Sequence, residues 1–216
     1  MTAHVSLSLA IEPIERVDAD VAFVTIFRDE RPLRGSAGRV DWRLCGRLSR
    51  LLREERWVGE VGEAALIPTQ GGLRAPLLIA AGLGARATFD ASRCRAAARD
   101  AVERARRLRA STLALVLLEA GAGAIALEAR LEALLRGVLG APSMGPKGSA
   151  DSLGLRLVVA PAERPAALEW LRAVRGRGLP SGVEVLVPDV GDARRVVAPR
   201  GAKSARPPDV ARPLVK

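Results

Sequence analysis

The stretch LLIAAGLGARATFD, residues 77–90, decides how the fold is interpreted. Its first half is a run of apolar residues that predicts a buried strand, and Asp90 at its end is a residue type that caps helices. Between them, Gly82 and Gly84 turn the chain and formally fit the dinucleotide-binding pattern G-x-G-x-x-G/A. The question is whether this glycine turn binds a phosphate or only connects a strand to a helix.

Two features favour a plain connection. In dinucleotide-binding folds the helix begins inside the glycine pattern and directs its N–H groups at the pyrophosphate. Here the helix is predicted to begin only at Asp90, and the acidic residue expected about 20 residues further on is missing. The glycines nevertheless stay candidates for cofactor binding, together with those of EAGAGAI (119–125), which gives the set Gly82, Gly84, Gly121 and Gly123.

Outward from this stretch, short apolar runs alternate with helical patterns. Strands are expected at 4–11, 20–27, 63–69, 75–81, 111–119, 153–161 and 182–188, and helices at 41–57, 90–109, 124–140 and 164–176. This alternation predicts an α/β fold, a three-layer α/β/α sandwich around a mixed, largely parallel sheet. We expect it to occupy residues 1–190 as one domain.

Two of the expected helices carry detailed predictions. In the first, 41–57, the spacing places Trp42, Cys45, Leu48, Leu51 and Leu52 on one apolar arc. In the second, 90–109, a stripe of small residues is suited to packing on the sheet, and arginines line the opposite, solvated side. The stripe consists of Cys94, Ala97, Ala101, Ala105 and Leu108, and the arginines are Arg95, Arg99, Arg106 and Arg109.

The chain is basic, and half of its excess charge lies at the C-terminal end. The formal net charge is +10, from 34 Lys and Arg against 24 Asp and Glu. Seven of these basic residues and only two of the acidic ones lie between Asp192 and Lys216. The segment 191–216 is rich in Pro and Arg without periodicity, which predicts a disordered tail. Its candidates for contact with nucleic acid or a partner are Arg194, Arg195, Arg200, Lys203 and Arg206.

The sequence offers little catalytic chemistry. Its one histidine is His4, so no histidine-based triad or histidine metal cluster can form. Gly140–Gly145 misses the phosphate-binding P-loop pattern because Pro146 replaces the required lysine and removes a backbone donor. We therefore predict no catalytic residue, no metal and no cofactor.

The cysteines and the hydropathy pattern indicate the compartment. Cys45 and Cys94 lie in apolar helical patterns, which suits reduced core thiols rather than a disulfide. No apolar run approaches the roughly 20 residues that span a bilayer, and the N-terminus lacks the basic start of a secretory signal. We expect a cytoplasmic protein without a membrane partner.

The order of several segments carries a resemblance to a known family. ADVAFVTIF, LLREERWVGEVGEAALIPTQ, LLIAAGLG and the small-residue helix RCRAAARDAVERARRL follow one another as in the N-terminal domain of the cytosol (leucyl) aminopeptidase family. The similarity extends over roughly residues 18–175, and the family's positions are held by Gly59, Gly62, Glu63, Gly82, Leu83 and Gly84.

The resemblance implies a macro-domain-like fold and a role without catalysis. In the family this domain does not carry the active site, which lies in a C-terminal domain that binds two divalent metals. The signature NTDAEGRL of that domain does not occur in this sequence. We therefore predict a non-catalytic, stand-alone domain that acts in protein interaction, oligomer assembly or regulation. Its expected partner is a second copy or a separately encoded aminopeptidase catalytic subunit.

Two alternatives remain open at this stage. Macro domains bind ADP-ribose between glycine-rich loops, and the two glycine segments follow successive expected strands, where such a ligand would lie. Weak, salt-sensitive binding of nucleic acid through the basic tail is the other alternative. The absence of Tyr and the scarcity of Phe and Trp argue against stacking on single strands.

Overall fold

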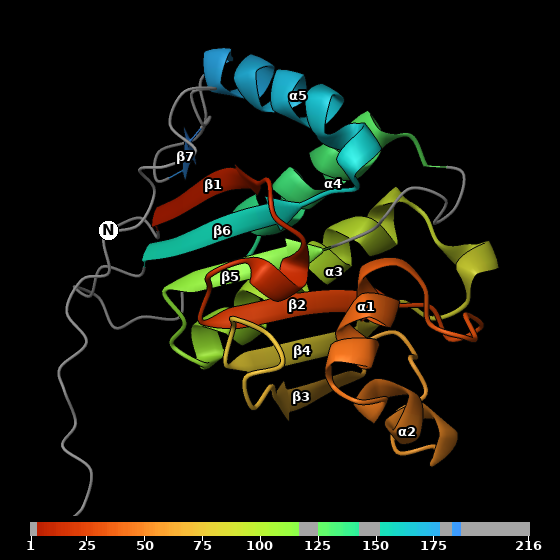
Figure 1. Cartoon of the computed structure of the whole chain (residues 1–216). Coiled ribbons are helices and arrows are strands. Elements are labelled where there is room, and N and C mark those ends of the chain that lie inside the picture. Colours follow the sequence, from red (N-terminus) through yellow and green to blue (C-terminus); the bar gives the residue numbers. More distant parts are fainter. Residues whose placement is uncertain (1–3, 117–124, 143–151, 178–182, 187–216) are drawn as a thin grey trace, which may run out of the picture.

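The computed structural model describes residues 4–116, 125–142, 152–177 and 183–186 (Figure 1). In this part of the chain a seven-stranded sheet has the order β3-β4-β2-β5-β6-β1-β7. The strands are β1 (His4–Ala10), β2 (Val21–Ile26), β3 (Ala64–Pro68), β4 (Leu77–Gly82), β5 (Thr112–Val116), β6 (Ser152–Val158) and β7 (Val183–Leu186). Neighbouring strands are parallel except β3 and β4, which pair antiparallel, so the predicted mixed, largely parallel sheet is confirmed.

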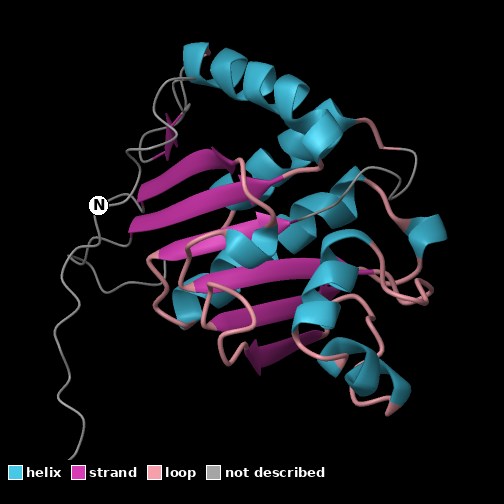
Figure 2. Cartoon of the chain, in the orientation of Figure 1, coloured by secondary structure: helices cyan, strands magenta, loops and turns pink. Residues whose placement is uncertain are grey.

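Helices cover both faces of the sheet, which confirms the three-layer α/β/α sandwich. They are α1 (Gly35–Arg43), α2 (Arg47–Arg53), α3 (Ala91–Arg107), α4 (Leu127–Leu139) and α5 (Arg164–Gly176). α1 and α2 lie on one face, and α3 and α4 lie on the other (Figures 1 and 2). α5 shares the hydrophobic core of α3 and α4.

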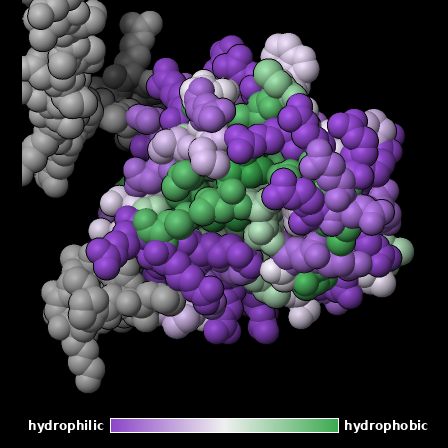
Figure 3. Space-filling model, turned by 90° about the horizontal axis from the view of Figure 1, so that it is seen from below, coloured by the Kyte–Doolittle hydropathy of each residue, from purple (hydrophilic) through white to green (hydrophobic). Residues whose placement is uncertain are grey.

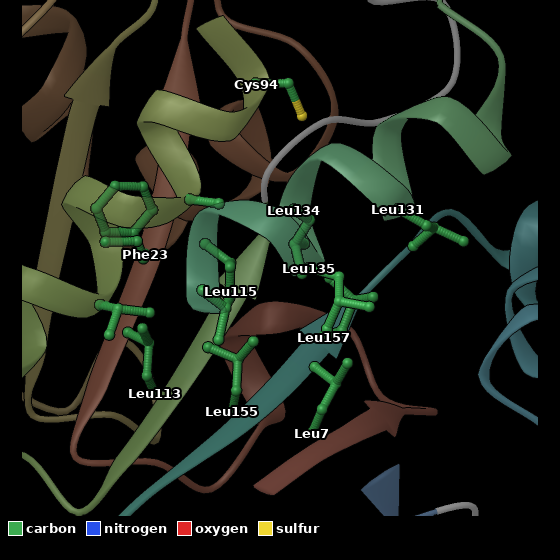
Figure 4. Close-up of a cluster of buried hydrophobic side chains, with 14 of the residues drawn as sticks. Leu7, Phe23, Cys94, Leu113, Leu115, Leu131, Leu134, Leu135, Leu155 and Leu157 are labelled. Atoms are coloured by element: carbon green, nitrogen blue, oxygen red, sulfur yellow. The ribbon is translucent and has the colours of Figure 1, made fainter. Parts of the chain in front are cut away.

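The core follows the alternation of side chains along the strands. Phe23, Leu115 and Leu157 are neighbours across β2, β5 and β6 and point to the α3–α4 face, where Leu134 of α4 meets them (Figure 4). The residues between them, such as Val24 and Ala114, belong to a second core under α1 and α2. Because the central strands are buried on both faces of the sheet, their sequences are continuous apolar runs.

The expected helix 41–57 is wrong in its extent. The structure has two short helices there, because Cys45 (φ 55°) and Gly46 (φ 74°) adopt left-handed backbone conformations between them. The Asp41 carboxylate accepts hydrogen bonds from the amides of Leu48 (2.8 Å) and Ser49 (3.1 Å) and so fixes the corner. Trp42 consequently is 78% exposed instead of lying on a buried arc. Cys45 is exposed too, so the expectation of two core thiols holds only for Cys94.

The expected helix 90–109 forms as α3 with Asp90 as its N-terminal cap. The Asp90 carboxylate accepts a hydrogen bond from the backbone amide of Arg93 (2.8 Å). The buried stripe is Cys94, Ala98, Ala101, Val102 and Ala105, and the expected Ala97 is partly buried against the same core. Leu108, which is 37% exposed, was wrongly included. The stripe lets α3 approach α4 closely, since a Cβ on Gly137 would lie 2.8 Å from the Ala98 Cβ. Arg106 is buried rather than solvated and donates to the carbonyl of Pro142 (2.7 Å).

Two further observations delimit the fold. Among the described residues no helix has the length and apolar content needed to cross a bilayer. The predicted tail 191–216 lies outside the described residues, so the division into a domain of residues 1–190 and a tail stays a prediction.

Candidate functional site

The glycine turn lies at the carboxyl edge of the sheet, where ligands of α/β proteins usually bind. β2 and β4 are parallel neighbours, so the segments that follow Ile26 and Gly82 leave the sheet side by side. The structure therefore places Gly82 and Gly84 next to the charged segment Arg28–Arg31 and next to Gly59–Glu63, which precedes β3.

Close backbone packing requires glycine at position 82, and a left-handed backbone conformation favours it at position 84. A Cβ on Gly82 would lie 2.2 Å from the carbonyl oxygen of Glu60 and 2.3 Å from the carbonyl carbon of Gly59. Gly84 has φ +72°, a left-handed conformation that glycine adopts without steric cost. The pattern of glycines thus has a structural cause that involves no ligand.

The amides of this turn are already used within the chain. Gly82 donates to the carbonyl of Glu63 (2.9 Å), Leu83 to that of Ile26 (2.9 Å) and Gly84 to that of Gly59 (3.0 Å). A phosphate at this turn would have to replace these three hydrogen bonds, which join the end of β4 to the segments beside it. The geometry favours the connecting role of the turn.

Charged side chains next to the turn bind one another and the backbone. The Arg86 amide donates to the Asp29 carboxylate (3.0 Å), and its guanidinium pairs with Glu30 (2.9 Å) and lies 4.4 Å from the centre of the Phe27 ring. Phe27 in turn meets the edge of Phe89, with ring centroids 5.3 Å apart. The amide hydrogen bond from Arg86 lowers the pKa of Asp29. The cluster holds the segments after β2 and β4 together.

Glu63 is an anchor that sequence reasoning missed. Its Oε2 accepts hydrogen bonds from the amides of Val58 (3.2 Å), Gly59 (3.0 Å) and Glu60 (3.0 Å). In the sequence, GEVGE (59–63) has the composition of a solvated turn. An acidic residue that follows two glycines at φ near +87° is the signal for such a carboxylate-bound loop, since glycine allows the amides to converge on one oxygen.

A second charged pair lies on the other side of the same edge. Arg130 of α4 and Glu163, just before α5, form an ion pair in which both side chains are largely buried. The nearby Cys94 thiol donates to the Arg130 carbonyl (3.7 Å), and its burial raises the pKa of Cys94 to about 12. A thiol with this pKa is not a nucleophile at neutral pH.

No metal centre is assembled in the described part of the chain. Its histidine, cysteine and carboxylate side chains form no group of three that could hold an ion. His4 stands exposed at the start of β1. The candidates Gly121 and Gly123, and the basic residues Arg194, Arg195, Arg200, Lys203 and Arg206, lie outside the described residues.

Three strongly exposed apolar side chains lie around the β3 end of the sheet, with Trp42 on the α1–α2 face and Leu66 on the α3–α4 face. Trp42 borders an open hollow of about 640 Å³ at the α1–α2 corner, lined also by Leu33 and Cys45. Leu66 of β3 is 52% exposed and Val61, just before that strand, is 57% exposed. Figure 3, which looks onto the β3 edge, shows hydrophobic side chains gathered between bands of hydrophilic ones. Apolar surface of this kind typically marks contacts with other proteins.

Residues 22–141 match the family model described as "Cytosol aminopeptidase family, N-terminal domain". A curated protein of Sulfurihydrogenibium, a probable cytosol aminopeptidase, is 26% identical over 107 residues, which cover 50% of this chain and 21% of that protein. The match therefore spans about a fifth of that relative's length.

Solved structures show the same fold. The macro domain of ganglioside induced differentiation associated protein 2 superposes with a TM-score of 0.63 at 16% identity, over 82% of this chain and 87% of that chain. A macrodomain of Oceanobacillus iheyensis gives 0.57 at 11% identity, over 80% and 93%. A tomato leucine aminopeptidase mutant gives 0.52 at 15% identity, over 82% of this chain and 38% of the enzyme.

Proposed function

Since the chain belongs to the cytosol aminopeptidase family, whose N-terminal domain it contains, we propose that it is a non-catalytic module for protein interaction. It acts in oligomer assembly or regulation, with a second copy or a separately encoded aminopeptidase catalytic subunit as its partner. Its place of action is the cytoplasm. The observation that carries this proposal is the exposed apolar surface at the β3 end of the sheet.

This surface has the composition of a contact site. Leu66 and Val61 are each more than half exposed at the β3 edge, and Trp42 is 78% exposed beside it on the α1–α2 face. Tryptophan and arginine side chains often supply a large share of the binding free energy when such a surface is covered by a partner. The same region carries arginines, for example Arg43 and Arg47, which suit the polar rim of an interface.

The carboxyl edge of the sheet supports the non-catalytic part of the proposal. Asp29, Glu30 and Glu63 are engaged by amides or by Arg86, and each of these contacts fixes a loop to its neighbour. A general base must instead reach a proton of the substrate. Structural roles for these carboxylates are sufficient to explain their positions.

The test combines an interaction measurement with an activity measurement. The purified chain is mixed with a purified aminopeptidase catalytic subunit from the same organism, and complexes are measured by size-exclusion chromatography with light scattering. We expect a complex with the catalytic subunit or a dimer of the chain, and no Mn²⁺-dependent cleavage of leucine p-nitroanilide by the chain alone. Cleavage that copurifies with the chain through several columns would refute a non-catalytic role. A chain that stays monomeric and binds no catalytic subunit would refute the interaction role.

A further inference from the structure

β3 is an edge strand whose outer side has no partner strand among the described residues. It stands at the end of the sheet order and pairs only with β4. Its sequence AALIP contains no charged side chain, although charges on edge strands are a common protection against pairing. The opposite edge strand, β7, carries Glu184.

The register defines which backbone groups point outward. Glu63 and Thr69 are bonded to the β4 side, through Gly82 N–H to the Glu63 carbonyl and Thr69 N–H to the Pro76 carbonyl. Because alternate residues of an antiparallel pair direct their N–H and C=O groups to the same side, Ala65 and Ile67 also face β4. The groups that point away from the sheet are therefore those of Ala64 and Leu66.

Contacts at both ends limit this open edge to a short segment. Arg104 of α3 donates to the Gly62 carbonyl (3.1 Å), and Arg47 of α2 donates to the Pro68 carbonyl (3.3 Å). Pro68 has no N–H to offer. Two donors and two acceptors remain between them, on Ala64 and Leu66.

From this geometry, and resting on the proposed function, we propose that β3 pairs antiparallel with β3 of a second copy of this chain. Ala64 of each copy then lies opposite Leu66 of its partner, and the two residues exchange both backbone hydrogen bonds, which gives four bonds in all. The two-fold axis passes between the Ala65 residues. Antiparallel residues that are not hydrogen-bonded approach to about 4.5 Å between Cα atoms, which a pair of alanines accommodates.

The side chains and charges complement one another in this arrangement. Leu66, 52% exposed in the single chain, packs beside the small Ala64 of the partner on the α3 face of the sheet. At the N-terminal end of β3, Arg104 of α3 is neutralised by Asp100 (2.6 Å), which leaves the carboxylate of Glu63 on the α1–α2 face of the sheet, the face of Ala65 and Ile67. At the C-terminal end, Arg47 of α2 approaches β3 from the same face. Antiparallel pairing therefore brings Arg47 of each copy toward Glu63 of its partner, which favours a second copy as the occupant.

The experiment is sedimentation velocity of the full chain over about a hundredfold range of concentration, because a short interface gives a weak, concentration-dependent dimer. The variants are Leu66→Lys, which removes the apolar contact, and Ala64→Pro, which removes one outward donor per copy. Proline at the first residue of an edge strand leaves the β4 ladder intact. The matched control is Leu186→Lys, which alters a leucine of similar exposure (47%) on the opposite edge strand. Circular dichroism melts confirm that each variant folds.

We expect the wild-type chain and Leu186→Lys to form a dimer, and Leu66→Lys and Ala64→Pro to raise the dimer Kd at least tenfold. A wild-type chain that stays monomeric would overturn the inference and leave the edge to a strand of another protein. A dimer that persists in both β3 variants would overturn it as well, while still supporting the proposed function through a different surface.

Discussion

Gly82 has no space for a side chain, because the backbone of Gly59 and Glu60 passes directly over its Cα atom. Relief requires movement of backbone rather than of a flexible side chain, so the cost is larger than for an ordinary crowded position. The same contact holds the turn before β3 against the end of β4, which makes this glycine a determinant of how the edge strand is placed.

We expect Gly82→Ala to lower the free energy of unfolding by about 3 kcal/mol, since the new Cβ would lie 2.2 Å from a carbonyl oxygen. Urea unfolding measures the effect. The control is Gly176→Ala at the end of α5, where a Cβ meets no atom within 4 Å and the change should be neutral or slightly stabilising. Equal stability of the two variants would contradict the packing argument.

The ionised Asp29 side chain is expected to contribute to the free energy of unfolding in a pH-dependent way. The amide of Arg86 holds the pKa of Asp29 below its ordinary value of 3.8. A lowered folded-state pKa means that the ionised carboxylate stabilises the folded chain above pH 3.8, and that this contribution is lost as the pH falls through the folded-state pKa.

Asp29→Asn should therefore be less stable than the wild type at pH 7, with a gap that shrinks below pH 3.8. Urea unfolding at a series of pH values measures the gap, and Asp18→Asn, at an exposed position, controls for the general loss of one negative charge. A gap that stayed constant across the series would show that the charge of Asp29 is not what matters.

At the scale of elements, the corner between α1 and α2 depends on one carboxylate. Asp41 accepts the amides of Leu48 and Ser49, which are otherwise unsatisfied at the start of a helix. Sequence periodicity predicted one helix where the structure has two, because apolar residues on both sides of the corner continue the same spacing. The left-handed conformation of Cys45 is a local consequence of this tertiary corner, and the one sequence signal beside it is Gly46, a residue type that commonly ends helices.

Asp41→Ala should cost about 1–2 kcal/mol of unfolding free energy, as the loss of a helix cap usually does. Thermal unfolding followed by circular dichroism measures it, with Asp18→Ala as the control at an exposed position. If the corner opens as expected, the exposed Cys45 thiol should also change its rate of reaction with a thiol reagent. An unchanged melting temperature would show that other contacts fix the corner.

At the scale of the whole molecule, the macro-like fold raises the question of a nucleotide ligand. The amides of Gly82, Leu83 and Gly84 are used by Glu63, Ile26 and Gly59, so this turn has no amides to spare for phosphate oxygens. We expect isothermal titration with ADP-ribose to give no saturable heat, and the same result with the Gly84→Ala variant. Micromolar binding by the wild-type chain would favour the ligand-binding alternative and would direct attention to Gly121 and Gly123.

The sequence by itself determined the sheet and the layers. Alternating apolar runs and helical patterns are local signals. A strand that is buried on both faces of a parallel sheet consists almost entirely of apolar residues, as Val21–Ile26 does. The cap of α3 was predictable for the same reason, since Asp90 bonds an amide only three residues away. The resemblance to the aminopeptidase N-terminal domain likewise depended on the order of such local segments.

Only the tertiary structure showed which acceptors the amides of the glycine turn bind, how the first helix divides and that Arg106 is buried. In each case the deciding partner is brought in by folding: Glu63 lies about 20 residues from Gly82 in sequence, and the Pro142 carbonyl that accepts from Arg106 is 36 residues away. Sequence periodicity reports which residues share a face of one element. Periodicity carries no information about which distant backbone segment packs against that face. In the glycine turn, such distant segments supply the carbonyl groups that accept hydrogen bonds from the amides.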